Sequence, residues 1–275
     1  MNLRGPLLPD GRTLGGENTL VMGILNVTPD SFSDGGKWAH VDAAIEHAHQ
    51  MIAEGAALVD IGGESTAPGS TRIDTDEEWK RIGPVVSSLA EDGIVCSVDT
   101  LHAASAVRAM EAGALIINDV SGGGWDPQML SVVADTKAGF ILQHYRALPG
   151  MPGEHFDYGP DLLATLSERL MHQVDLALDA GVNGDAIVID PGLGFSLMNE
   201  QCWQIVRSLG ELTALGYPIL IGASRKRFIK ATGRDVDEET GRVSVTCMRN
   251  SVWAVRVHNV GLNVAMMREG NEETR

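Results

Sequence analysis

Short runs of β-branched and aliphatic residues recur along this chain of 275 residues, and each run is followed by a stretch in which apolar positions have helical spacing. This alternation is typical of repeated strand–helix units that form a parallel sheet. The predicted strands are 20–27, 57–62, 94–99, 115–119, 139–144, 186–190, 218–224 and 254–258. The predicted helices are 42–54, 76–91, 102–112, 127–136, 160–180, 200–215, 238–250 and 260–269.

Eight alternating units predict an α/β fold, a closed (β/α)8 TIM barrel in a single domain, 1–275. Residues 1–18 are expected to be an N-terminal extension, and residues 270–275 a C-terminal tail. A doubly wound open sheet is the alternative. Such a sheet commonly has a glycine-rich turn after its first strand, whereas this first strand ends in Asn26-Val27-Thr28, so the barrel is favoured.

Charge and composition restrict the possible partners. The chain has 21 Lys and Arg against 37 Asp and Glu, a formal net charge of −16, which argues against binding to nucleic acid or to an anionic membrane. Its apolar runs are far shorter than the roughly 18 residues of a membrane span, and its N-terminus lacks the pattern of a signal peptide. We therefore expect a cytoplasmic protein with a small-molecule partner. Cys96, Cys202 and Cys247 lack the spacing of a metal site and are expected to be buried thiols.

Four basic residues stand close together in this acidic chain: Arg225, Lys226, Arg227 and Lys230. A solvated helix start is one interpretation of the cluster. Cations at the start of a helix oppose its dipole, however, so the cluster favours an anionic ligand there.

Polar residues occur at the carboxyl ends of all eight predicted strands, where barrels of this kind hold their active sites. The strand ends are Asn26, Asp60, Asp99, Asn118-Asp119, His144, Asp190, Ser224-Arg225-Lys226 and Arg256-Val257-His258. Asp60 and Asp119 are expected to be structural, since Asp60 precedes a tight glycine turn and Asp119 alternates with Asn118 along its strand. A core position is favoured for His144, and solvated helix positions for His47, His49, His102 and His172.

The strand ends form two chemically distinct sets. Asp99, Asp190 and Asn118 offer the acceptors that would suit the edge of a flat heterocycle rich in N–H groups. Lys226, Arg256 and His258 lie at the ends of the seventh and eighth strands, where barrels frequently bind phosphate. The sequence therefore predicts a polar heterocycle that carries a phosphate group as the ligand.

Seven strings carry a resemblance to a known family. They are Gly23-Ile-Leu-Asn-Val-Thr-Pro-Asp-Ser-Phe-Ser-Asp-Gly-Gly36, Asp60-Ile-Gly-Gly-Glu-Ser-Thr66, Ser97-Val-Asp-Thr100, Ile117-Asn-Asp-Val-Ser-Gly122, Asp190-Pro-Gly-Leu-Gly-Phe195, Gly222-Ala-Ser-Arg-Lys-Arg-Phe-Ile229 and Arg256-Val-His258. In this order they resemble the dihydropteroate synthases of folate biosynthesis. The resemblance implies a transferase that condenses 7,8-dihydropterin-6-ylmethyl diphosphate with 4-aminobenzoate, with help from Mg2+. It also implies a homodimer and a target of sulfonamides.

The resemblance implies a role for each matching residue. Asn118 and ionised Asp99 and Asp190 would hold the pterin, and the two carboxylates would stabilise positive charge on its methylene. Lys226 would lie near the pterin carbonyl, and Asn26 would bind Mg2+. Arg256, His258 and Thr66 would contact diphosphate, Pro68 and Ser224 would border the aminobenzoate cleft, and Phe195 would be a further substrate-binding residue. The catalytic set would be Asp99, Asp190, Lys226, Arg256 and His258.

The chain departs from the family pattern at four positions: Ala67, Gln143, Leu197 and Asn259. Ala67 and Leu197 stand where the family usually has cations, for which Arg72 or Arg225 would compensate. These changes leave open a non-catalytic pterin-binding paralogue. Another pterin-binding barrel, such as a methyltetrahydrofolate methyltransferase, is a second alternative, but it has no need of a diphosphate site.

Overall fold

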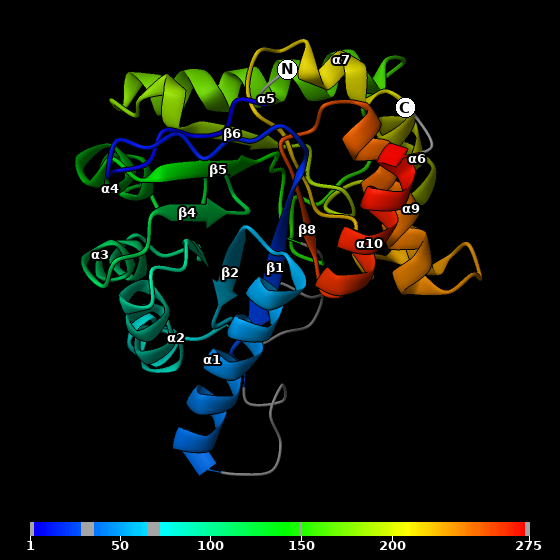
Figure 1. The fold of residues 1–275 in the computed structure, drawn as a ribbon. Coiled ribbons are helices and arrows are strands. Elements are labelled where there is room, and N and C mark those ends of the chain that lie inside the picture. Colours follow the sequence, from blue (N-terminus) through cyan, green and yellow to red (C-terminus); the bar gives the residue numbers. More distant parts are fainter. Residues whose placement is uncertain (1–2, 29–35, 65–71, 149, 273–275) are drawn as a thin grey trace.

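The computed structural model describes residues 3–28, 36–64, 72–148 and 150–272. In these residues, eight parallel strands form one sheet in the order β6-β5-β4-β3-β2-β1-β8-β7, with the helices outside it (Figure 1). The strands are β1 (Leu20–Asn26), β2 (Leu58–Gly62), β3 (Cys96–Asp99), β4 (Ile116–Asp119), β5 (Gly139–Gln143), β6 (Ile187–Asp190), β7 (Leu220–Ile221) and β8 (Ala254–Val257).

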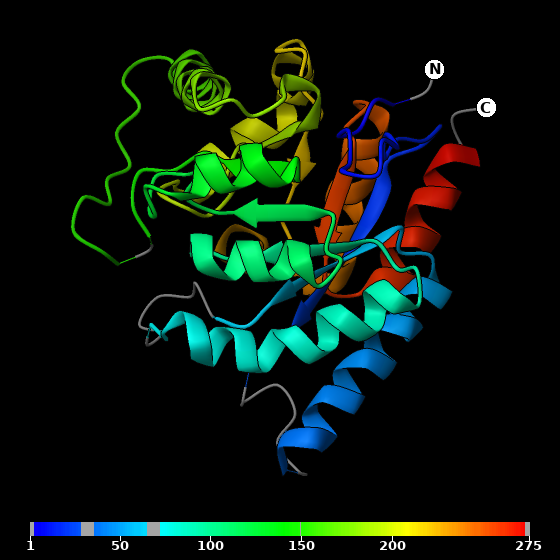
Figure 2. The ribbon, with the colours of Figure 1, turned by 90° about the vertical axis from the view of Figure 1, so that its left-hand side faces the viewer.

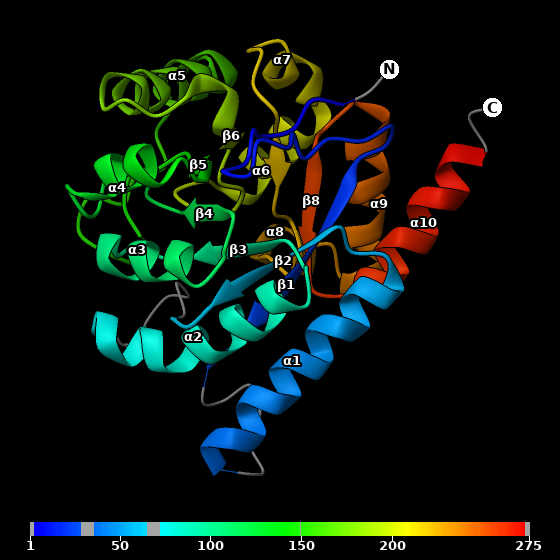
Figure 3. The same cartoon turned by 60° about the vertical axis from the view of Figure 1, so that its left-hand side comes forward.

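The helices follow the strands in turn and surround the sheet, as Figure 3 shows. They are α1 (Gly36–Glu54), α2 (Thr75–Glu91), α3 (Ala103–Glu111), α4 (Met129–Thr136), α5 (Leu162–Asp179), the 3-10 helix η1 (Gly184–Ala186), α6 (Asn199–Arg207), α7 (Leu209–Thr213), α8 (Arg227–Lys230), α9 (Val236–Arg249) and α10 (Val260–Glu272). In the described residues, no helix is long and apolar enough to cross a membrane.

Local sequence accounts for several helix boundaries. Asp74, Asp161 and Asp235 cap the starts of α2, α5 and α9, where each carboxylate accepts a hydrogen bond from a backbone N–H of the first turn. A glycine with positive φ follows the ends of α1, α2, α3, α5 and α7, at positions 55, 93, 113, 181 and 216.

The sheet closes into a barrel between β6 and β7. Ile189 and Ile219 form a parallel bridge, and the Ile189 N–H donates to the Pro218 carbonyl over 2.9 Å. The predicted TIM barrel is therefore confirmed. The expected strand 218–224 is wrong in length, because only Leu220–Ile221 joins the ladder and residues 223–226 form a turn closed by Lys226 N–H and the Ala223 carbonyl.

The barrel interior is apolar at one end and polar at the other. An apolar cluster that includes Met22, Leu58, Ile116, Val188 and Leu220 fills the end where the strands begin. Because side chains alternate along a strand, the next interior positions lie two residues further on and approach the carboxyl ends. A separate, larger cluster packs the outer faces of the strands against the helices.

The N-terminal residues close the apolar end. Residues 3–16 form a hairpin through bridges Leu3–Gly16 and Leu7–Thr13 (dark blue in Figure 1). Leu8 joins the apolar cluster, and the Trp253 ring N–H donates to the Leu14 carbonyl over 2.7 Å. The segment expected to be an extension thus packs against the base of the barrel, so the open end is the one where the strands finish.

Several helix boundaries differ from the prediction, among them the start of α1 at Gly36 rather than at residue 42. The expected helix 200–215 is divided into α6 and α7 at Ser208, whose φ of −119° and ψ of 26° interrupt the helical backbone. The short helix α8 lies within a segment that has no predicted helix. At the C-terminus, α10 continues to Glu272, so all of the described part of the expected tail is helical.

Candidate active site

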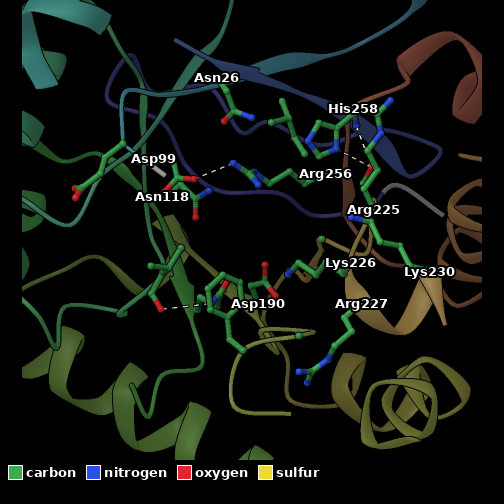
Figure 4. A pocket seen from close by; sticks show the side chains of 18 of the residues that line it. Asn26, Asp99, Asn118, Asp190, Arg225, Lys226, Arg227, Lys230, Arg256 and His258 are labelled. Carbon is green, nitrogen blue, oxygen red and sulfur yellow. Dashed lines mark hydrogen bonds and ion pairs between the residues drawn. The ribbon is translucent and has the colours of Figure 1, made fainter. Parts of the chain in front are cut away.

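A cavity of about 710 Å3 opens where the strands end (Figure 4). Nine of the eleven predicted site residues line it: Asn26, Asp99, Asn118, Asp190, Phe195, Ser224, Lys226, Arg256 and His258. The other two, Thr66 and Pro68, lie outside the described residues. The expectation that the polar residues at the strand ends meet at one site is therefore correct for side chains that are more than 200 positions apart in the sequence.

One side of the cavity is a hydrogen-bonded set of carboxylates around Arg256. The guanidinium Nη2 donates to Asp99 Oδ2 over 2.8 Å, and Nε donates to Asp60 Oδ2 over 2.5 Å. Asn118 Nδ2 donates to the same Asp60 oxygen over 2.9 Å. Two of the three guanidinium nitrogens are thus held by carboxylates, which leaves Nη1 as the part of Arg256 with the most capacity for an anion.

Burial changes the protonation of this set. It raises the pKa of Asp99 to about 7, although the Arg256 charge opposes the shift. Burial also disfavours the Arg256 cation, but Asp60 and Asp99 outweigh it and hold the pKa of Arg256 above its usual value. The ionised state expected for Asp99 therefore depends on the Arg256 cation that donates to it.

Asp190, which is buried, and Lys226, which is half-buried, interact electrostatically. Both Lys226 Nζ and Asp190 Oδ2 lie within 4 Å of the position that a Cβ on Gly222 would occupy. Asp190 Oδ1 accepts a hydrogen bond of 2.7 Å from Gly192 N–H, and Lys226 Nζ donates to the Leu193 carbonyl. Burial lowers the pKa of Lys226 to about 8 and raises that of Asp190, and in each case the partner's charge opposes the shift.

An aromatic ring completes the surroundings of Lys226. The ammonium nitrogen lies 4.6 Å from the centroid of the Phe195 ring, a distance suited to a cation–π contact. The loop that carries this ring turns back at Gly194, where φ is +81° and a Cβ would lie 3.1 Å from Lys226 Cδ. Lys226 is therefore held between a carboxylate, a carbonyl and an aromatic face.

His258 is neutral rather than cationic in this pocket. Its Nδ1 lies 2.9 Å from Ser224 Oγ, and its backbone N–H donates to the same oxygen over 3.2 Å. Burial, and then the charges of Arg225 and Arg256, lower the pKa of His258 to about 4. Its place in the predicted cationic set is thus corrected: near pH 7 it offers a neutral imidazole.

The basic cluster from Arg225 to Lys230 borders the same cavity. Arg225, which has a φ of 58°, makes two contacts of 3.1 Å with Asp237. The charge of Arg225 is therefore already paired. Among the described residues, Arg227 makes two long contacts, 3.4 Å to Asn199 Oδ1 and 3.5 Å to the Leu197 carbonyl. Arg227 and Lys230 are exposed and remain the more available cations.

The four residues that depart from the family pattern lie in different surroundings. Leu197 is buried in the outer core, and Asn259 binds Asp237 and the start of α10. Gln143 lines the cavity, and Ala67 lies outside the described residues. Of the cations expected to compensate, Arg72 pairs with Glu64 over 3.1 Å and Arg225 with Asp237, so both already serve a carboxylate.

The histidine predictions have mixed outcomes. His144 is fully buried beside Arg169 and does not line the cavity, as expected for a core position. His49 and His172 are exposed, whereas His47 is partly buried. The prediction for His102 is wrong, because its ring lies 3.5 Å from Glu64 and is only 20% exposed. The three cysteines are buried, as expected.

Several cavity residues were not predicted. Gly150, Glu154 and Phe156 come from the connection between β5 and α5, which Figure 2 shows as a long extended loop. This loop has no hydrophobic period that would indicate its path. Glu64 stands in one of the motif strings, but only the fold places it at the cavity. Among the described residues, no group of three His, Cys, Asp or Glu could hold a metal ion.

Comparisons with known proteins agree with this geometry. The family model described as "Pterin binding enzyme" matches residues 22–258. The dihydropteroate synthase of Mycobacterium leprae is 44% identical over 259 residues, which cover 90% of this chain and 91% of that protein. The dihydropteroate synthase of Bacillus subtilis is 43% identical, with 89% of this chain and 85% of that protein covered.

Solved structures show the same likeness. The dihydropteroate synthase of Xanthomonas albilineans with 4-aminobenzoic acid has a TM-score of 0.88 and 35% identity, covering 98% of each chain. The same enzyme in complex with 7,8-dihydropteroate has a TM-score of 0.84, covering 96% of this chain and 97% of that one. The enzyme of Yersinia pestis in a sulfonamide complex has a TM-score of 0.87 and 33% identity, covering 100% and 99%.

Proposed function

This chain belongs to the dihydropteroate synthases, transferases of the pterin-binding enzyme family, and from that premise we propose that it condenses 7,8-dihydropterin-6-ylmethyl diphosphate with 4-aminobenzoate. The products are 7,8-dihydropteroate and diphosphate. One observation carries the proposal: a single cavity has buried carboxylates and an amide on one side and a basic cluster on the other. A bare pterin would not require the basic side, so this observation also disfavours a methyltetrahydrofolate methyltransferase.

The pterin occupies the carboxylate side. Its amino-pyrimidine edge presents N–H groups, and Asp190 and Asn118, each 4% exposed, provide acceptors deep in the cavity. The Lys226 ammonium suits the pterin carbonyl, because it is a donor that lies close to Asp190. Arg256 then serves the pterin as well as the diphosphate, since two of its nitrogens bind carboxylates on this side.

The diphosphate occupies the basic side, toward His258, Arg227 and Lys230. The metal assigned to Asn26 fits this arrangement only as a complex with the diphosphate, because Asn26 is a single exposed amide at the end of β1. Mg2+ commonly binds through one or two protein oxygens together with substrate phosphates. When bound, it would neutralise charge on the leaving diphosphate.

The reaction breaks the bond between the pterin methylene carbon and the diphosphate oxygen. The electron pair leaves with the diphosphate, and the amine of 4-aminobenzoate forms the new C–N bond and then releases a proton. Positive charge that develops on the methylene and ring is stabilised by Asp99 and Asp190. We place the aminobenzoate beside Phe195 and Ser224, at the entrance to the pterin site.

The pH dependence of the reaction should report on Lys226. Its pKa is lowered to about 8, so the cation is present below this pH and is lost as the pH rises through it. We expect kcat/KM for the pterin diphosphate to fall with an apparent pKa of about 8 on the alkaline side. In Lys226→Arg, where the charge persists, this alkaline limb should move up by more than one pH unit. An unchanged limb in the variant would assign it to another group.

His258 should distinguish diphosphate from pterin binding. A neutral hydrogen bond contributes about 0.5–1.5 kcal/mol, so we expect His258→Ala to weaken pterin diphosphate binding about three- to tenfold. Binding of 6-hydroxymethylpterin, which lacks the diphosphate, should change less than twofold. Calorimetric titration of both ligands makes the comparison, and equal losses would count against the assignment.

The proposed activity is tested by incubating the protein with pterin diphosphate, 4-aminobenzoate and Mg2+. We expect dihydropteroate and diphosphate in equal amounts, and much less of both when a chelator removes the Mg2+. Pterin binding without product would favour the non-catalytic paralogue. The homodimer expected from the family resemblance belongs to the same proposal, and sedimentation equilibrium would show it as twice the mass of the chain.

A further inference from the structure

Asp60 lies beneath the pterin side of the cavity and does not line it. It is fully buried on β2, in register with Ile24 of β1 and Ser97 of β3. Asp99, a cavity residue, stands one interior position higher, since Gly62 of the same strand as Asp60 is in register with it. A ligand in the cavity would therefore meet the partners of Asp60 rather than Asp60 itself.

Two of those partners share a single oxygen. Asp60 Oδ2 accepts from Arg256 Nε over 2.5 Å and from Asn118 Nδ2 over 2.9 Å. Arg256 in turn reaches Asp99, so one carboxylate oxygen connects strands β2, β3, β4 and β8 below the cavity. Loss of its charge would leave the guanidinium with Asp99 as its one remaining carboxylate contact in the described residues.

The contact with Asn118 also decides which end of the amide a ligand meets. A side-chain amide has one donor end and one acceptor end. Because Nδ2 donates to Asp60, Oδ1 is the end left for a ligand, and it accepts N–H groups. An uncharged side chain at position 60, or one that donates a hydrogen bond, would allow the Asn118 amide to turn and present its NH2 group to the ligand.

We propose that Asp60 is a positioning residue for the pterin site, which holds the Arg256 guanidinium and the Asn118 amide in the orientations that bind the heterocycle. The identity of the heterocycle rests on the proposed function. Asp60 thus selects for a ligand edge rich in N–H groups although it does not touch the ligand. This goes beyond the structural role expected from the sequence.

The test compares Asp60→Asn with a matched control, Glu78→Gln. Glu78 is equally buried, and its Oε2 likewise accepts two hydrogen bonds, from Thr100 and Ser105, but neither partner lines the cavity. We expect Asp60→Asn to weaken binding of 6-hydroxymethylpterin about tenfold and to raise KM for the pterin diphosphate. The KM for 4-aminobenzoate should change less than twofold. Glu78→Gln should change pterin binding less than twofold.

A double-mutant cycle with Asn118→Ala tests whether Asp60 acts through the amide. The combined loss in pterin affinity should be clearly smaller than the product of the two single losses. Unchanged pterin affinity in Asp60→Asn, or losses that multiply, would overturn the proposal. If Asp60→Asn does not fold, a crystal structure of the wild-type chain with 6-hydroxymethylpterin decides: both contacts with Asp60 should persist, and their loss would overturn the proposal.

These experiments distinguish failure of the proposed function from failure of the proposed role of Asp60. A chain that forms no dihydropteroate but binds 6-hydroxymethylpterin less tightly in Asp60→Asn would retain the positioning role and lose only the condensation. If the wild-type protein forms dihydropteroate but Asp60→Asn binds 6-hydroxymethylpterin as tightly as the wild type, the proposed function holds and the positioning role of Asp60 fails.

Discussion

Replacement of Lys226 by methionine is expected to lower kcat/KM for the pterin diphosphate by about 10²- to 10³-fold, the range for removal of one preorganised electrostatic contact. Lys226 lies near Asp190, the Leu193 carbonyl and the Phe195 ring. Methionine keeps most of the apolar stem and removes the ammonium group, with its charge and its N–H donors. Asp190 then lacks its main compensating cation, and its pKa should rise further. Steady-state kinetics at pH 7 measure the loss.

A matched control is Lys80→Met, which removes an exposed cation on α2, away from the cavity residues. It should leave kcat/KM within twofold of the wild type. Thermal unfolding of both variants tests whether the fold survives. A folded Lys226→Met enzyme with kcat/KM within tenfold of the wild type would show that this cation is not part of the reaction site.

The second large effect is expected for Asp190→Asn. Loss of a charge-assisted contact costs roughly 1.5–3 kcal/mol, so the affinity for 6-hydroxymethylpterin should fall about 10- to 150-fold. The amide can still accept from Gly192 N–H, so the local turn should be preserved. Calorimetric titration measures the affinity.

The control for this variant is Asp175→Asn, which neutralises an exposed carboxylate on α5 and should not change pterin binding. An Asp190→Asn protein with the wild-type affinity would mean that the heterocycle does not use the carboxylate side. The assignment of Asn118 and Asp99 to the pterin would then fall with it.

Much of the barrel could be predicted because its signals are local. Apolar residues recur with strand and helix periods, and each strand end carries a polar residue that the parallel arrangement brings to one mouth. The length of β7 could not be predicted, because residues 222–224 are compatible with a strand. Their departure from it depends on the turn at Arg225 and Lys226, which tertiary contacts stabilise.

The sequence predicts which residues form the site better than it predicts their protonation states and contacts. His258 has the residue type of a cation, but its burial and its neighbours Arg225 and Arg256 make it neutral. His102 has a helical pattern, yet the fold places it against Glu64. These properties depend on desolvation and on charges that are distant in the chain, so no local pattern carries them.

Asp60 illustrates the same limit. Its position before a glycine turn correctly indicates a buried structural residue, but the sequence cannot show that Arg256 and Asn118 both donate to it. Glu154 and Phe156 were missed for a different reason, because the β5–α5 loop has no periodicity from which to infer its path to the cavity.

The central claim is that one cavity holds the heterocycle on its carboxylate side and the diphosphate on its basic side. A crystal structure with the bound pterin diphosphate tests it most directly. The account predicts the amino-pyrimidine edge within hydrogen-bond distance of Asp190 and Asn118, and the diphosphate toward His258 and the basic cluster. A pterin ring bound among the basic residues, with the diphosphate away from them, would contradict it.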